Sequence, residues 1–343
     1  MSSFSVFERD GSGELFSAQT FLETLRLSNP RWQRDFDGGA AHVFRGHGDS
    51  TWQLKPTAWR SPQPLELLKP RYRGQFQQRG MLPGLRLNFT KGQNGTLRTL
   101  KYEEIRRDTK LLRYFRVIYG ELFVLKKFAE MADELGLHTS PFPTEPPVKP
   151  DTLFQETTVE WSLDARNSHQ WIPFSQLAVY GQHYGVPTRL LDWTRNPLMA
   201  AFFAADHWMN KPIEERASSI AVWSCSTKNR HLKKLKVRLV DSSRENNVRL
   251  KAQDGVLMHI TASERSFQKS GSWRALDETY GDEFIPSSNV VKMFPLQKYI
   301  LKGEEVPELH ELLHTERYSV AHSMPSLQNI AEYTVNRFFE VDQ

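Results

Sequence analysis

The spacing of apolar residues along this chain predicts both helices and strands. A period of three to four residues, typical of amphipathic helices, recurs at 18–27, 102–135, 171–181, 291–301, 307–313 and 326–338. Alternating or short continuous apolar runs, typical of strands, occur at 41–46, 220–223, 236–240 and 255–260, with a further extended piece at 52–57. The elements follow no regular βαβ rhythm. The sequence therefore predicts an α+β fold, in which a mixed central sheet of short strands is flanked by helices.

Two of the predicted helices carry clear end signals. Asn196 followed by Pro197 is typical of an N-cap and a first helical residue. The following residues, 198–205, are apolar and mostly small, which favours a helix packed closely on a sheet. Gly136 is a suitable C-terminal cap for the long helix, because glycine adopts the left-handed conformation without a steric penalty.

Two segments lack either periodicity. Residues 61–100 are irregular and basic, and we interpret them as an inserted loop region. A solvated surface is the simplest role for that charge, since few aromatic residues are interleaved with the basic ones. Contact with nucleic acid is the alternative. Residues 139–151 form a Pro-rich loop, because proline supplies no amide donor to a helix or an inner strand.

Composition limits the class of protein. With 343 residues, 39% of them hydrophobic, the chain can bury one sizeable core or one core and a smaller lobe. Its single cysteine, Cys225, excludes an internal disulfide framework and a thiolate-rich zinc site. No long apolar run indicates a membrane span, and the first residues do not resemble a signal peptide, so we expect a cytoplasmic protein. The net charge of +5 mildly favours a polyanionic partner.

The most informative stretch is 182–197, which gathers polar side chains around a Gly-Val-Pro turn and the start of the small-residue helix. Its polar candidates are His183, Arg189, Asp192, Trp193 and Thr194. Such groups are costly to bury unless they find partners, and here they lie at the edge of a predicted rigid core. A functional site is commonly built at such a place.

Structural roles are alternatives for each of these candidates. An arginine further upstream, Arg45, can stabilise the fold by pairing with Asp192 or Asp49, and Arg189 can pair with Asp192. A role in local packing or hydrogen bonding is the alternative for His183, Trp193 and Thr194.

The histidines give little support for a metal site. His310 and His314 stand at i and i+4, and with Glu311 they match the short pattern of zinc proteases. Chance matches to so short a pattern are common, and no third ligand stands nearby in the sequence. We therefore expect no metal.

Phe44-Arg45-Gly46 and residues 182–194 strongly resemble the FRG domain, a family named for its Phe/Tyr-Arg-Gly signature. The resemblance continues through 196–198, Ala201, 203–204, Arg249 and 253–256. It covers roughly residues 15–340 without the basic insertion, which implies a single FRG-type domain over 1–343.

A weaker resemblance is to the arginine-class ADP-ribosyltransferases, and it implies a fold of that type and NAD as a substrate. Residues 44–46 fill the place of the family's aromatic-Arg-Gly strand, 191–194 that of its Ser-Thr-Ser strand, and 253–257 that of its Glu-x-Glu strand. Gln253 and Gly255 stand where the two glutamates are expected, so this sequence departs from that pattern. Asp192 is the first candidate to replace them, and a glutamate in 278–283 is the alternative.

The resemblance implies roles for individual residues, because breaking the nicotinamide–ribose bond places positive charge on the ribose and requires a cation for the pyrophosphate. The candidate catalytic residues are Arg45, Asp192, Thr194 and Gln253. The candidate cofactor-binding residues are Phe44, Gly46, His183, Tyr184, Arg189 and Trp193.

Three hypotheses follow. The first is an NAD-dependent ADP-ribosyltransferase or NAD glycohydrolase that acts on nucleic acid or protein; the resemblance implies a bacterial or phage toxin or antiphage defence effector, with an antitoxin as a potential partner. The second is a non-catalytic FRG module that binds a nucleotide or nucleic acid, which the missing Glu-x-Glu favours. The third is an interaction protein whose polar cluster is internal scaffolding.

Overall fold

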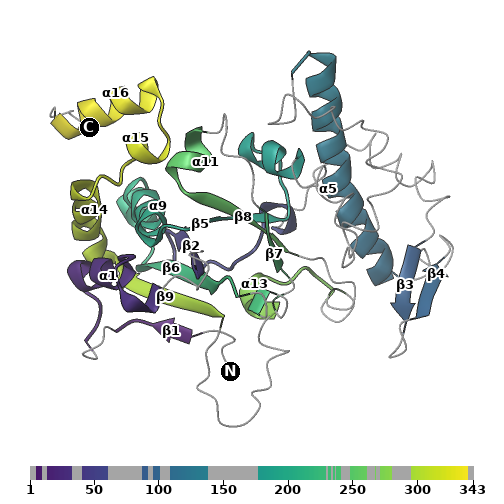
Figure 1. Ribbon diagram of the computed structural model, residues 1–343, viewed down its shortest axis with the longest axis horizontal. Coiled ribbons are helices and arrows are strands. Elements are labelled where there is room, and N and C mark those ends of the chain that lie inside the picture. The colour runs from purple at the N-terminus through teal and green to yellow at the C-terminus, as the bar shows by residue number, and fades with distance from the viewer. Residues whose placement is uncertain are drawn as a thin grey trace, which may run out of the picture. The chain divides into compact units, whose positions relative to one another are not determined.

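The structure is a computed structural model. It describes residues 5–9, 14–32, 41–60, 87–91, 96–100, 109–137, 177–228, 231–232, 235, 237–240, 248–260, 267, 271–279 and 295–338. The chain divides into two compact units, which are described separately (Figure 1). Unit 1 comprises Met1–Leu54, Leu191–Met258 and Leu276–Gln343. Unit 2 comprises Lys55–Leu190 and His259–Ala275.

A seven-stranded mixed sheet is the centre of the fold. Its strands are β1 (Ser5–Phe7), β2 (His42–His47), β5 (Leu190–Thr194), β6 (Ser219–Ser226), β7 (Val237–Val240), β8 (Gly255–Ile260) and β9 (Leu296–Lys302). Their order is β1-β9-β6-β2-β5-β8-β7. β1 runs parallel to β9, whereas β6 pairs antiparallel with both β9 and β2. The predicted α+β class with a mixed sheet is confirmed.

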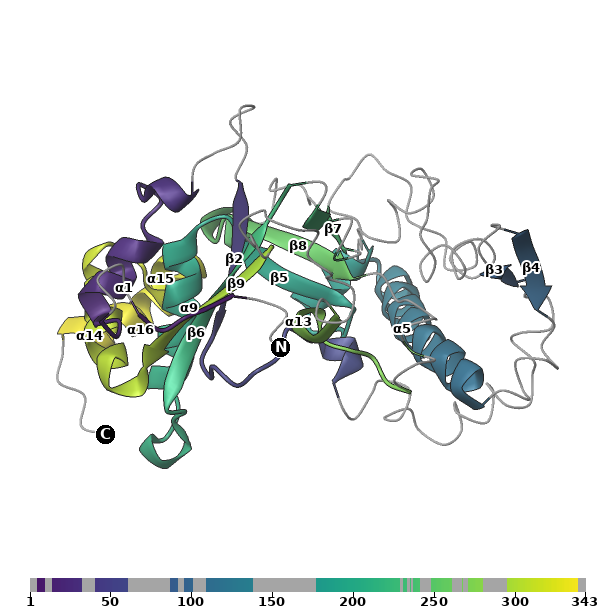
Figure 2. The ribbon, with the colours of Figure 1, turned by 90° about the horizontal axis from the view of Figure 1, so that it is seen from below.

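The described part of unit 1 also contains helices of different lengths. They are α1 (Ala18–Leu25), α9 (Pro197–Met209), α11 (Val248–Ala252), α13 (Leu276–Thr279), α14 (Val306–Thr315), α15 (Val320–Ser323) and α16 (Leu327–Phe338). Short 3-10 turns lie at η1 (Pro30–Trp32), η3 (Ile213–Glu215) and η5 (Gly303–Glu305). Figure 2 shows α1, α9 and α14 together on the same side of β2, β6 and β9. One apolar core fills the space between them.

Close packing of α9 on β2 explains why the sequence of α9 is apolar and small. Asn196 caps the helix, as predicted: its side-chain oxygen accepts hydrogen bonds from the amides of Leu198 and Met199. A Cβ atom added to Gly46 in β2 would lie 1.9 Å from the carbonyl oxygen of Ala200 and 2.9 Å from the amide nitrogen of Ala204. Only glycine permits this approach of strand and helix backbones.

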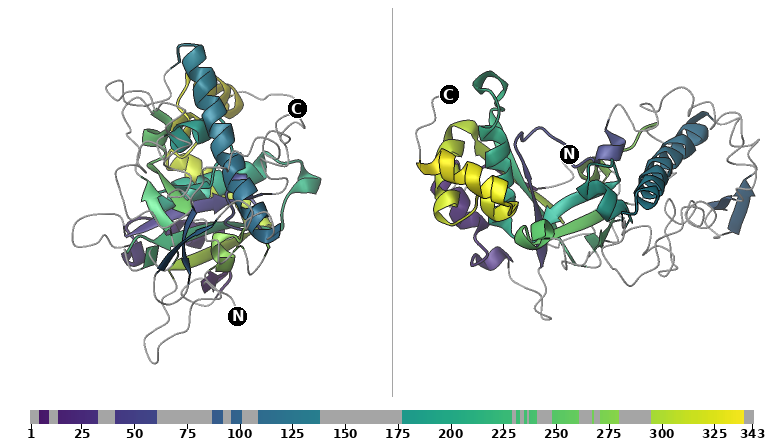
Figure 3. Two further views of the ribbon diagram at one scale, coloured as in Figure 1. Left: turned by 90° about the vertical axis from the view of Figure 1, so that its right-hand side faces the viewer. Right: turned by 90° about the horizontal axis from the view of Figure 1, so that it is seen from above.

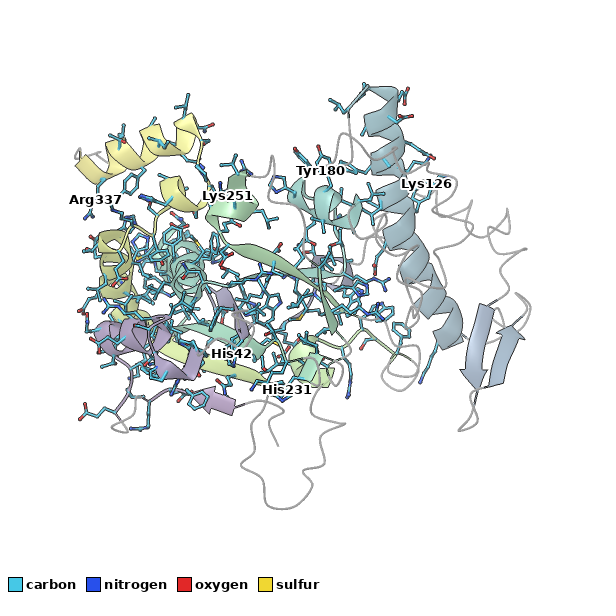
Figure 4. All side chains as sticks on the ribbon, in the orientation of Figure 1. His42, Lys126, Tyr180, His231, Lys251 and Arg337 are labelled. Carbon is cyan, nitrogen blue, oxygen red and sulfur yellow. The ribbon has the colours of Figure 1, made fainter. Side chains whose placement is uncertain are left out.

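Unit 2 contains the long helix α5 (Thr109–Glu134), the 3-10 turn η2 (Thr57–Trp59) and a helical segment at 177–183. The predicted cap of the long helix is confirmed, because Gly136 has a φ of +69° and its amide bonds the carbonyl of Asp133. Gly181 lets the 177–183 segment pack against the Leu125 side chain of α5. Figure 4 shows Tyr180 beside α5, in agreement with the 6.2 Å between its ring and that of Phe128.

Three sequence predictions differ from the structure. The helix expected over 291–301 is wrong where it is described: Leu296, Tyr299 and Ile300 have helical spacing, but they lie in β9, an inner strand with apolar residues on both faces. Residues 52–57 form no strand. Within the segment expected to be irregular, β3 (Leu87–Lys91) and β4 (Thr96–Leu100) form an antiparallel hairpin.

The Pro-rich loop at 139–151 and the rest of the basic segment lie outside the described residues. The single FRG-type domain over 1–343 stays a prediction. Among the helices in the described part of the chain, none is both long and apolar enough to cross a membrane.

A cluster of charged residues joins the C-terminal helices of unit 1, where α15 and α16 lie beside α14 (Figure 3). The Nε2 atoms of His310 and His314 in α14 are 3.3 Å apart, and His310 Nε2 is 3.8 Å from Oδ1 of Asp206 in α9. Arg337 of α16, labelled in Figure 4, donates to Glu311 at 2.8 Å. Burial and the neighbouring His310 lower the pKa of His314.

Substitution of Gly46 by alanine tests the contact between strand and helix. We expect Gly46→Ala to lower the free energy of unfolding by roughly 3 kcal/mol or more, because backbone atoms of α9 cannot move aside without displacing the helix. Gly48→Ala is the matched control: the atoms nearest to its added Cβ belong to the His207 side chain and not to the backbone, so they can move aside at a lower cost. Urea unfolding of both variants measures the difference, and equal losses would contradict the account.

The His310–His314 pair predicts a loss of stability in acid. Because the pKa of His314 is lowered in the folded state, the unfolded chain binds more protons than the folded chain as the pH falls. The contribution of neutral His314 to the free energy of unfolding is therefore present above the ordinary pKa of 6.5 and is lost as the pH falls below it. We expect the melting temperature to fall between pH 8 and 5.5, and to fall less steeply in His314→Gln. An unchanged slope in the variant would refute the assignment, and His207→Gln on α9 serves as an exposed control.

Candidate functional site

Strand alternation sets the surroundings of Arg45. Phe44 and Gly46 face α9 and the apolar core, so Arg45 and His47 project from the opposite face of the sheet. The register pairs Arg45 with Trp223 of β6, and Trp223 with Lys298 of β9. These side chains therefore share one face.

Arg45 bridges two strands that share little backbone pairing. β2 and β6 pair over six residues, whereas the pairing between β2 and β5 is Phe44 with Thr194. Arg45 Nη1 donates to the carbonyl oxygen of Asp192 at 2.6 Å and lies 3.9 Å from Asp192 Oδ2. The Arg45 side chain is 17% exposed and that of Asp192 is 72% exposed. The proposed Arg45–Asp192 pair is thus present, with its carboxylate in solvent.

The Arg45 guanidinium is fixed from a second direction by His47, whose Nε2 accepts a hydrogen bond from Arg45 Nε at 3.2 Å. His47 is itself buried. The guanidinium plane is therefore oriented by groups from both β2 and β5.

Trp193 adds a buried donor to the same face. Because Phe44 pairs with Thr194, alternation along β5 places Trp193 on the face that carries Arg45 and directs Asp192 to the other face, so the guanidinium meets Asp192 where β2 and β5 adjoin. Trp193 is buried, and its Nε1–H has no hydrogen-bond partner in the described part of the chain. A buried donor without a partner costs about 1–3 kcal/mol, a cost that a ligand oxygen can remove.

Two candidate catalytic residues have structural hydrogen bonds instead. Thr194 Oγ1 donates to the carbonyl oxygen of Gln253 at 2.7 Å and accepts from the amide of Asn196 at 2.9 Å. The side chain of Gln253 donates to the carbonyl oxygen of Ser323 at 3.1 Å. These bonds fix the end of β5 and the start of α9. The roles of Thr194 and Gln253 in catalysis stay predictions.

Lys298 brings a second cation to the face that carries Arg45. Its Nζ lies 4.9 Å from the centroid of the Trp223 ring and donates to the carbonyl oxygen of Ser50. Burial lowers the pKa of Lys298, whereas the nearby Asp277 raises it. Burial also raises the pKa of Asp277, which accepts a hydrogen bond from the amide of Leu54.

Three of the candidate cofactor-binding residues belong to unit 2. Arg189 is fully buried, and its Nε is 2.8 Å from Oε2 of Glu121 in α5. The other Glu121 oxygen accepts from Trp59 Nε1 at 2.9 Å. The expected pairing of Arg189 with Asp192 is therefore wrong: its partner is Glu121, which the sequence did not indicate because the two residues are 68 positions apart.

His183 and Tyr184 lie at the end of the 177–183 helical segment and are exposed. Their rings meet edge to face with centroids 5.1 Å apart, and Tyr184 also contacts Tyr180. Gly185 follows with a φ of +87°, which explains the glycine at this turn. Binding of a cofactor by His183 or Tyr184 stays a prediction.

Sequence reasoning missed Trp52. This residue closes the turn after β2, is 43% exposed, and contacts both His47 and His207. Nothing in the sequence indicated that the indole of Trp52 lies beside His47, the partner of Arg45. Among the described residues, no group of three or more His, Cys, Asp or Glu side chains is arranged to hold a metal ion.

The Arg189–Glu121 pair predicts a large effect on stability. Arg189→Met leaves a buried carboxylate without its cation, so we expect a loss of about 3–5 kcal/mol in the free energy of unfolding. The double variant Arg189→Met/Glu121→Gln is expected to recover a substantial part of that loss. Urea unfolding of the three proteins measures this, and a single variant as stable as wild type would contradict a structural role.

Comparison with known proteins identifies one family. The family model of the FRG domain matches residues 146–212. The matched range includes the polar cluster at 182–197 but does not include Phe44-Arg45-Gly46. No curated protein and no solved structure matches the chain in these comparisons. None of these findings connects the chain to ADP-ribosyltransferases. Over residues 146–212 this chain is therefore similar to the FRG domain.

Proposed function

We propose that NAD binds at the Arg45 guanidinium, where β2 and β5 adjoin, and that the chain is an NAD-dependent ADP-ribosyltransferase or NAD glycohydrolase. The observation that supports this most is the fixed, mostly buried guanidinium of Arg45 next to the exposed carboxylate of Asp192. The two groups supply the cation and the anion that NAD cleavage requires.

Arg45 is suited to the pyrophosphate of NAD. A guanidinium presents planar, paired donors that match phosphate oxygens, and its attraction is strengthened where the side chain is mostly shielded from water. The buried Nε1–H of Trp193 offers a further donor on the face that carries Arg45. Lys298 on β9 adds positive charge to the same face.

Asp192 is the acid in this proposal. When the bond between nicotinamide N1 and ribose C1′ breaks, its electron pair leaves with nicotinamide and positive charge develops on the ribose. A carboxylate beside C1′ stabilises that charge. The acceptor then adds to C1′: water gives hydrolysis, and a protein or nucleic-acid nucleophile gives transfer. Asp192 thus takes the role of the missing Glu-x-Glu.

A non-catalytic nucleotide- or nucleic-acid-binding module is the second candidate. The observation that favours it is that Thr194 and Gln253, expected to act in catalysis, are engaged in hydrogen bonds to the backbone. Under this alternative Arg45 binds phosphate and no bond is broken. A role as a toxin or antiphage effector, with an antitoxin partner, belongs to the first proposal.

Release of free nicotinamide from NAD tests the proposal, with the purified protein alone and with DNA, RNA or cell lysate added. We expect release by wild type and a loss of about a hundredfold or more in Arg45→Ala, because the phosphate contact disappears. Arg45→Lys keeps the charge without the paired donors and is expected to fall in between.

Arg26→Ala is the matched control, since it removes a partly exposed arginine of unit 1 that pairs with Glu316. Circular dichroism establishes that each variant is folded, which matters because Arg45 links β2 to β5. Asp192→Asn is expected to abolish release while binding of ADP-ribose persists. No release by folded wild type with any acceptor would refute the enzyme and leave the binding module.

A further inference from the structure

The turn that follows β2, residues 47–52, is held rigidly. The amide of Ser50 donates to the carbonyl of Ser219 at 2.9 Å, and the two serine hydroxyls are 2.7 Å apart. Asp49 Oδ1 accepts from both the amide and the hydroxyl of Thr51 at 2.8 and 2.7 Å. The amide of Trp52 bonds the Asp49 carbonyl at 3.2 Å. Trp52 therefore leaves the turn in a fixed direction.

Trp52 carries a large apolar surface that the fold does not bury. Its side chain remains 43% exposed although two imidazoles contact it. The centroid of its ring lies 5.0 Å from that of His207 at 80°, and 6.0 Å from that of His47 at 61°. Exposure of this apolar ring to water is unfavourable. A flat ligand that covers the ring would remove that exposed surface and gain hydrophobic stabilisation.

His47 connects this indole to Arg45. The His47 ring contacts Trp52, and its Nε2 accepts the hydrogen bond from Arg45 Nε. On the other side of the guanidinium, Arg45 Nη1 reaches Asp192. A chain of contacts thus links Trp52 through His47 to Arg45, and Arg45 to Asp192.

We propose that Trp52 stacks on the base of a nucleotide whose phosphates Arg45 binds, so that this face recognises the adenosine diphosphate part of its ligand. This inference rests on the proposed function and deepens it. The adenine lies on Trp52, the pyrophosphate at Arg45, and the ribose that reacts beside Asp192. Stacking of a base on an aromatic side chain depends on the flat face of the base and is worth enough to be measured by truncation.

Calorimetric titration with two probes tests this assignment, using ADP-ribose, which carries the base, and inorganic pyrophosphate, which does not. We expect Trp52→Ala to weaken ADP-ribose binding by roughly 5- to 100-fold and to leave pyrophosphate binding unchanged. Trp52→Phe, which keeps an aromatic face, is expected to retain most of the affinity. Arg45→Ala is expected to weaken both probes.

Leu327→Ala, which truncates a highly exposed apolar residue of α16, is the matched control and is expected to bind both probes as wild type does. Wild-type affinity for ADP-ribose in folded Trp52→Ala, or an equal loss for pyrophosphate, would overturn the role of Trp52. If Trp52→Ala does not fold, loss of ADP-ribose binding in folded Trp52→Leu, which has no aromatic face, with retention in Trp52→Phe supports the role, and retention in both overturns it.

The two proposals fail in different ways. Nicotinamide release by wild type together with unchanged ADP-ribose binding in Trp52→Ala refutes the stacking residue and leaves NAD chemistry intact. If Trp52→Ala selectively loses ADP-ribose binding and the wild type releases no nicotinamide, the stacking role of Trp52 is supported and the NAD chemistry is refuted. Failure of wild type to bind ADP-ribose overturns the assignment of the adenosine diphosphate part.

Discussion

The close approach of α9 to β2 at Gly46 is the contact on which the arrangement of unit 1 depends. The backbone of α9 lies where any Cβ at position 46 would stand, so the separation of strand and helix is set by backbone atoms. The small residues of α9 and the Asn196 cap serve this contact. A strand held in this way has little freedom to slide or rotate, because a shift by one residue would bring Arg45 into the apolar core.

This constraint fixes the side chains on the other face of the sheet. Since Phe44 and Gly46 must face α9, Arg45 and His47 must face away, and the register then brings Arg45 beside Trp223. The arginine also supplies a link between β2 and β5 through the Asp192 carbonyl. A structural and a binding role for Arg45 are therefore compatible: the bonds that hold the strands together also orient the guanidinium.

The polar cluster at 182–197 divides into parts with different roles. Arg189 enters a buried ion pair with Glu121 and stabilises unit 2. Thr194 and Asn196 shape the passage from β5 to α9. Asp192 stays largely exposed beside Arg45. Part of the polar density in the sequence thus serves stable packing, and Asp192 is the residue that is left for the proposed site.

Local signals in the sequence were sufficient for much of the fold. The cap at Asn196, the left-handed Gly136 and the strand around Arg45 were predictable, because each depends on neighbouring residues. The strand β9 was not, since an inner strand is apolar on both faces and its spacing imitated a helix.

The residues of the candidate site also divide into those that local sequence indicates and those that depend on distant contacts. Arg45 and Asp192 were recognisable as a potential pair, and the structure brings them to 3.9 Å. The partner of Arg189 and the place of Trp52 depend on contacts between residues far apart in the chain. No local pattern contains that information.

Amide hydrogen exchange with and without ADP-ribose tests most directly the claim that a nucleotide binds on the Arg45 face. Binding there is predicted to slow exchange in peptides covering 42–52 and 191–196, because a ligand stabilises the strands and the turn that it contacts. Peptides covering α14 and α16 are predicted to be unchanged. Slower exchange confined to other segments, or no change at saturating ADP-ribose, would contradict the account.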